Sequence, residues 1–126
     1  KNEVLIFAFL SLRKQNFERT EKILKLIKNP KSALIRKQQG FFYYLHGLIQ
    51  SQKNLTIAEK HFRESLKLGL SMNHDIAMAK LSLAGIMMQK RRKREAQALL
   101  TEAKDYDKHN ILTAQIKLMQ EQMKRI

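Results

Sequence analysis

Residues 83–103, LAGIMMQKRRKREAQALLTEA, contain the pattern that decides the fold. An apolar stretch leads into a basic, polar turn at residues 89–92, and Ala96, Leu100 and Ala103 then follow at spacings of four and three. Apolar residues three and four positions apart lie on one face of a helix. The stretch therefore predicts two amphipathic helices joined by a short turn.

The same pattern occurs three times, at an offset of 38 residues. The superposed positions are Phe7, Leu45 and Leu83 in the first helix of each copy, and Thr20, Ala58 and Ala96, then Leu24, Phe62 and Leu100, in the second. Polar turns are expected at residues 13–16, 51–54 and 89–92. Self-similarity at such a period is typical of α-solenoids, in which each helix pair buries its apolar face against its neighbours.

The repeat divides the chain into segments that we expect to form a single domain. They are repeat one at about residues 1–31, repeat two at about 32–70, repeat three at about 71–108 and a capping helix at about 110–126. Pro30 is expected to end the second helix of repeat one, and Gly69 that of repeat two. Asn73 or Asp75 is expected to cap the following helix, and Asn110 the last one.

Composition agrees with an all-α fold. The 126 residues include one Pro and four Gly, which are few for the turns of an all-β protein, and no Cys, which excludes disulfides and thiolate sites. The longest apolar run, residues 4–12, is shorter than the roughly 18 residues that span a membrane. Because the sequence starts at Lys1 rather than Met, we expect a trimmed or processed chain with an upstream segment that tethers it to a membrane. The basic composition agrees with a cytoplasmic location of this part.

The residues resemble the tetratricopeptide repeat family over nearly the whole chain. The matching positions are Phe42, Leu45, Ile49, Leu55, Ala58, Phe62 and Ser65 in the second copy, and Leu83, Ala84, Met87, Ala96, Leu100 and Ala103 in the third. The usual period in that family is about 34 residues, so 38 residues add about one helical turn to each copy. The resemblance implies a right-handed solenoid whose first helices line a concave, peptide-binding groove.

Carried onto this sequence, the groove is almost uncharged. Its members would be Leu5, Phe9, Leu12, Tyr43, Tyr44, Gly47, Gln50, Met78, Leu81, Ser82, Gly85 and Met88. A surface rich in Met suits an amphipathic helix or an apolar extended peptide. Gly47 and Gly85 either admit the backbone of a partner or relieve crowding between helices. Residues 41–44, FFYY, either form a ligand platform or pack between helices.

Family members that bind chaperone C-termini use a clamp of Lys, Asn and Arg side chains in this groove. The matching positions here hold Leu5, Phe9, Tyr44, Met78 and Ser82. The resemblance therefore implies that this chain has no carboxylate clamp for a chaperone tail.

Positive charge is the strongest feature of the composition. Lys and Arg number 25 against 11 Asp and Glu, a formal net charge of +14. The densest run is Lys90, Arg91, Arg92, Lys93 and Arg94, in the third turn. It is a solvated turn, a patch that binds RNA, DNA or anionic lipid headgroups, or a nuclear localisation signal. We expect it to lie on a different surface from the groove.

Signatures of catalysis are missing from the sequence. The histidines, His46, His61, His74 and His109, form no HExxH motif, and there is no P-loop, GxGxxG or GxSxG. We therefore predict no catalytic residues, no metal and no cofactor. The predicted function is a non-catalytic scaffold that binds a protein or peptide in an apolar groove. The alternative is a basic module for nucleic acid or an anionic membrane surface.

Overall fold

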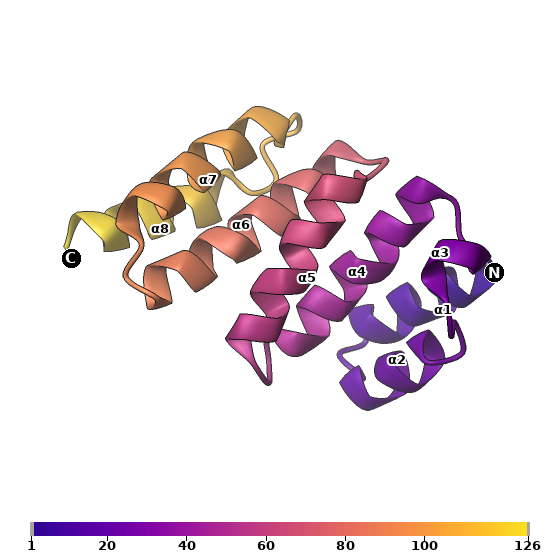
Figure 1. Cartoon of the computed structure of the whole chain (residues 1–126). Coiled ribbons are helices and arrows are strands. Elements are labelled where there is room, and N and C mark those ends of the chain that lie inside the picture. Colours follow the sequence, from indigo (N-terminus) through magenta and orange to yellow (C-terminus); the bar gives the residue numbers. More distant parts are fainter. Residues whose placement is uncertain (1, 126) are drawn as a thin grey trace. The chain divides into compact units, whose positions relative to one another are not determined.

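The computed structural model describes residues 2–125, except for the side chains of Asn2 and Ala33. These residues form eight helices and no strand, which confirms the all-α prediction (Figure 1). Residues 1 and 126, the outer ends of the predicted first repeat and capping helix, lie outside the described part. The helices are α1 (Asn2–Arg13), α2 (Phe17–Leu24), α3 (Pro30–Ala33), α4 (Arg36–Gln50), α5 (Leu55–Leu68), α6 (Asn73–Gln89), α7 (Lys93–Tyr106) and α8 (Thr113–Lys124).

The chain divides into two compact units, Lys1–Leu70 with α1 to α5 and Ser71–Ile126 with α6 to α8. The boundary between them falls where repeat two was predicted to end. None of the described helices is both long and apolar enough to cross a membrane.

The starts of three helices recur with the predicted period. Phe17, Leu55 and Lys93 begin α2, α5 and α7, and successive starts are 38 residues apart. Each of these helices packs against the one before it, so that α1 pairs with α2, α4 with α5 and α6 with α7 (Figure 1). The three predicted turns are confirmed to within one residue.

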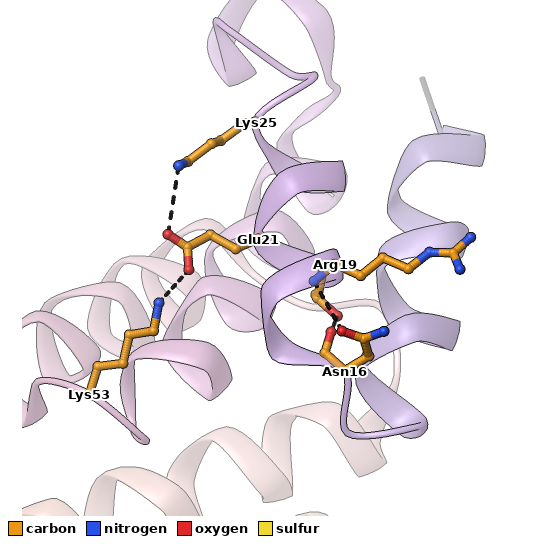
Figure 2. Close-up of polar contacts among 6 residues, drawn as sticks. Asn16, Arg19, Glu21, Lys25 and Lys53 are labelled. Atoms are coloured by element: carbon orange, nitrogen blue, oxygen red, sulfur yellow. Dashed lines mark hydrogen bonds and ion pairs between the residues drawn. The ribbon is translucent and has the colours of Figure 1, made fainter.

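Side chains and backbone geometry both define these turns. The Asn16 carboxamide oxygen accepts from the backbone N–H of Arg19 (Figure 2), and that of Asn54 accepts from Thr56 and Ile57, as N-cap residues do. In the first and third turns the chain reverses through left-handed residues, Gln15 with φ 58° and Arg91 with φ 61°. Both turns close with a backbone hydrogen bond between residues five positions apart, from the N–H of Asn16 to the carbonyl oxygen of Ser11 and from that of Arg92 to that of Met87. This is the pattern of a Schellman motif without its usual glycine.

The repeated positions are buried, with one exception. The fully buried members are Thr20, Leu24, Leu45, Ala58, Phe62, Ala96 and Leu100. Leu83 is 1% exposed, whereas Phe7, its counterpart in α1, is 61% exposed. The expectation that Phe7 belongs to the core is therefore wrong. Because α1 packs against α2 and α4 through Leu5 and Ala8, its side that carries Phe7 faces outward.

Two predicted helix ends in the first unit have different outcomes. Gly69, with φ 98°, is the C-cap of α5, as expected. Pro30 does not end a helix, because α2 stops at Leu24 and Pro30 is the first residue of α3. The first position suits proline because its missing N–H would have no partner there.

Gly40 and Gly69 bring the ends of α4 and α5 into close contact. A Cβ atom added at Gly40 would collide with the carbonyl oxygen of Gly69 and lie 3.3 Å from that of Ser65. No larger residue fits at position 40 unless the two helices move apart.

The predicted caps in the second unit are wrong. Asn73 is the first residue of α6, and the residue before it, Met72, makes no side-chain capping bond. At α8 the polar contacts come from the buried carboxylate of Asp107, which accepts from the N–H groups of Ile111 and Leu112, both at 2.9 Å. Asn110 instead adopts a left-handed conformation inside the turn, where small polar residues are tolerated.

The C-terminal helix α8 packs within its unit through apolar residues. Leu112, Ile116 and Met123 are buried, and α8 contacts α6 and α7. Leu118 lies on the opposite, exposed side of the helix. This arrangement gives α8 one buried apolar face and an exposed face that is mostly polar but includes Leu118.

Candidate binding surfaces

Aromatic and imidazole rings of α4 and α5 form a cluster in the first unit. The Phe42 and His46 rings meet edge to face with centroids 4.6 Å apart, and His46 lies 5.4 Å from His61. Tyr43 stacks on His61 at 5.8 Å and is partly exposed. We call Phe42, Tyr43, His46 and His61 the histidine cluster.

Burial keeps both histidines of this cluster neutral. Loss of hydration lowers the pKa of His46 to about 4, and repulsion from His61 acts in the same direction. The Glu21 carboxylate opposes this effect, but weakly, because it is already paired with Lys53 and Lys25 (Figure 2). Burial, with the nearby Lys60 charge, also lowers the pKa of His61. The cluster is therefore an uncharged, mostly apolar surface.

The predicted groove residues of the first unit divide by exposure. Leu5, Tyr44 and Gly47 are buried and hold the unit together. The partly exposed members are Phe9, Leu12, Tyr43 and Gln50. A row of rings joins two of the helices, since Phe9 lies 5.8 Å from Phe41, and Phe41 lies 6.0 Å from Tyr44. The FFYY segment therefore contributes Phe42 and Tyr44 to the core and leaves Phe41 and Tyr43 at its margin.

The two repeated glycines have different surroundings. A Cβ atom at Gly47 would stand 2.8 Å from the Phe62 ring, so Gly47 relieves crowding between α4 and α5. A Cβ atom at Gly85 would meet only the Met119 methyl group, at an ordinary 3.6 Å. Gly85 is therefore next to α8, and its position has room for a methyl group.

In the second unit the predicted groove residues line α6. Leu81 is buried, whereas Met78, Ser82, Gly85 and Met88 are partly exposed. Each of the two units thus presents its own set of predicted groove residues at its surface.

A hollow of about 490 Å³ lies at the end of α6. Its lining is Met88, Gln89, Arg91, Lys93 and Met123. We call it the methionine hollow. It joins a predicted groove residue, Met88, to two residues of the basic turn, so the expectation that groove and turn occupy different surfaces is wrong here. Met123 of α8 was not among the predicted site residues, because only packing brings this helix beside the turn.

The basic turn is largely open to solvent. Arg91, Arg92, Lys93 and Arg94 are exposed, and Lys90 is partly buried. Arg91 takes a left-handed conformation, which directs the chain sharply from α6 into α7. Of the five cations, Arg91 and Lys93 line the methionine hollow.

Two further observations bear on function. Among residues 2–125 no three His, Asp or Glu side chains are grouped so that they could hold a metal ion. No protein family, curated protein or solved structure that was compared matches this chain. The geometry of its own residues is therefore the basis for proposing a function.

Proposed function

We propose that this chain is a non-catalytic protein-interaction module that holds a partner segment in the methionine hollow. The observation that carries the proposal is the shared lining of that hollow, where Met88 and Met123 lie beside Arg91 and Lys93. Methionine side chains adapt to irregular apolar groups, and arginine binds carboxylates through two parallel hydrogen bonds. The best-suited occupant is a peptide or helix that places a large apolar residue next to Asp or Glu.

The net charge of +14 supports the approach of such a partner. A positive field raises the rate at which an acidic segment encounters the surface, while burial of its apolar residue slows dissociation. Affinity should therefore depend on salt mainly through the association rate.

We also propose that the three helix pairs are tetratricopeptide-like repeats of one solenoid. The recurrence of helix starts at 38 residues supports this proposal. In it, the partly exposed groove residues would form a binding surface within each unit. They are Phe9, Leu12, Tyr43 and Gln50 in the first unit, and Met78, Ser82, Gly85 and Met88 in the second.

Site-specific photocrosslinking tests the hollow directly. A photoreactive phenylalanine replaces Met88 in one variant and Leu118, which is 60% exposed on α8, in a control variant. We expect position 88 to capture a defined partner segment in cells, with Asp or Glu beside the crosslinked residue. Arg91→Glu should abolish that capture.

Equal capture by positions 88 and 118 would contradict the proposal. Crosslinks from position 88 that lead mainly to nucleic acid or lipid would contradict it as well.

A second candidate function rests on the four consecutive exposed cations, Arg91 to Arg94. They would bind phosphates of nucleic acid or of an anionic membrane, with an affinity that falls steeply as salt rises. Titration with single-stranded RNA, duplex DNA and phosphatidylserine vesicles between 50 and 300 mM salt measures this. The triple variant Arg91→Glu, Arg92→Glu, Arg94→Glu should lose the binding, whereas Met88→Asp should lose only peptide binding.

A further inference from the structure

One side of α1 exposes three large apolar side chains. Ile6 is 49% exposed, Phe7 61% and Leu10 46%. Positions 6, 7 and 10 are spaced so that their side chains share one helix face. Isolated apolar residues at a surface need no explanation, but a contiguous group on one helix marks an interaction surface.

The internal repeat indicates what covers such a face. The residues 38 positions after Ile6 and Phe7 are Tyr44 and Leu45 of α4, which are 4% and 0% exposed. On α4 these positions belong to a helix that packs against α1, α2 and α5. The exposed face of α1 thus carries large apolar side chains at positions that are buried by helix packing in its counterpart, α4.

A hollow of about 270 Å³ lies beside this face. It is lined by Phe7, Leu10, Ser11, Lys14, Asn16 and Arg19. Figure 2 shows the Arg19 side chain extended away from α2, while its backbone N–H is bound by Asn16. Phe7 and Leu10 supply its apolar lining, and the two charged lining residues are both cations, so the hollow is complementary to a large apolar side chain flanked by carboxylates.

We infer that the α1 face, formed by Ile6, Phe7, Leu10, Lys14 and Arg19, docks an acidic amphipathic helix of a partner protein. A second copy of this chain is a poor occupant, because each copy carries a net charge of +14 and the rim of the hollow is itself basic. This surface belongs to the first unit and shares no residue with the methionine hollow, so either proposal can fail without the other.

A pair of peptides that differ only in charge tests the inference. Both are stapled helices with the sequence of residues 16–28, which includes α2. In the protein α2 packs against α4, the counterpart of α1 in the second copy, so this sequence serves as a model for a helix that covers the α1 face. One keeps the native lysines, and the other carries Lys22→Glu, Lys25→Glu and Lys28→Glu. Fluorescence anisotropy with the full chain measures the affinity of each peptide. We expect the acidic peptide to bind at least about tenfold more tightly than the native one, as opposite charge at the rim favours it.

Variants of the chain locate the binding site. The double variant Phe7→Gln, Leu10→Gln should weaken binding of the acidic peptide about tenfold or more, as loss of buried anchor residues does. Leu26→Gln is the matched control, because Leu26 is 70% exposed in the same unit but does not line the hollow. Lys14→Glu with Arg19→Glu should invert the preference in favour of the native, basic peptide. Since all these side chains lie at the surface, circular dichroism should show unchanged helix content.

Four results would overturn the inference. They are equal binding of both peptides, equal loss in the Phe7/Leu10 and Leu26 variants, binding of phosphatidylserine vesicles through Phe7 without binding of the acidic peptide, and Phe7-dependent dimers in sedimentation. The last two would assign the face to a membrane and to self-association, respectively.

Discussion

The imidazole rings of His46 on α4 and His61 on α5 lie with their centroids 5.4 Å apart at an interplanar angle of 34°. Each ring also meets an aromatic neighbour, Phe42 for His46 and Tyr43 for His61. Two imidazolium charges at this distance would repel, and burial penalises each of them. The ring contact between α4 and α5 is therefore favoured when both imidazoles are neutral.

Acid should destabilise the fold through His46. Its pKa is about 4 in the folded chain against a usual 6.5, so the unfolded chain takes up this proton first as pH falls. The contribution to stability is complete well above pH 6.5 and is lost as the pH falls through 6.5 to about 4, by on the order of 3 kcal/mol. Urea unfolding at a series of pH values measures the loss. His46→Gln should flatten the profile over this range, and His109→Gln, at an exposed site, should not.

Alanine at the two repeated glycines should have opposite effects. Gly85→Ala should stabilise by up to about 1 kcal/mol, because alanine favours helix and the nearest atom is the Met119 methyl group at 3.6 Å. Gly47→Ala should destabilise by about 1–3 kcal/mol, because its methyl group would press on the Phe62 ring. Chemical denaturation compares the two variants with the parent chain. A gain in stability at both positions would show that α4 and α5 approach less closely than described.

Ser65 and Ala103 occupy the same position of the second and third copies, and both are fully buried. The Ser65 hydroxyl has no hydrogen-bond partner among the described residues. Ser65→Ala should therefore stabilise by about 1 kcal/mol, and the reciprocal Ala103→Ser should destabilise by a similar amount. Thermal unfolding of the two single variants tests this pair. A destabilised Ser65→Ala variant would mean that the hydroxyl is satisfied in solution.

The left-handed turn residues lack the glycine that such positions favour. Gln15→Gly and Arg91→Gly should each stabilise by about 1 kcal/mol, because a side chain at positive φ costs roughly that much. Gln52→Gly is the control, since it lies in the turn between α4 and α5 without positive φ, and it should lose stability. Arg91→Gly also removes one cation from the methionine hollow, so peptide affinity should fall while unfolding requires more denaturant. If peptide affinity and stability both rose, or both fell, in Arg91→Gly, the result would contradict the role given to Arg91 in the turn and in the methionine hollow.

The local sequence pattern was sufficient to predict the turns, but it was insufficient to predict which helix faces are buried. The turn before Leu55 could be predicted because Asn54 precedes an amphipathic stretch and caps it directly. The exposure of Phe7 could not, because burial of a helix face depends on what packs there, and α1 and α4 have different neighbours. Pro30 was ambiguous for a local reason, as proline both follows one helix and starts another.

The candidate site required contacts between distant segments. Met88 and Met123 are far apart in the sequence and share a hollow only because α8 packs on α6 and α7. The turn before α8 is held by the buried carboxylate of Asp107, which accepts from two backbone N–H groups, and not by Asn110, the expected cap. An acidic residue at the end of one helix, a few positions before the next, is a signal that could have found it.

The close contact at Gly40 sets a limit on how the internal copies can diverge or be recombined. The residue 38 positions after Gly40 is Met78, whose side chain would collide with the carbonyl oxygen of Gly69 if α6 alone took the place of α4 beside an unchanged α5. Exchange of α4 alone for α6 should therefore destabilise the first unit unless position 40 remains glycine.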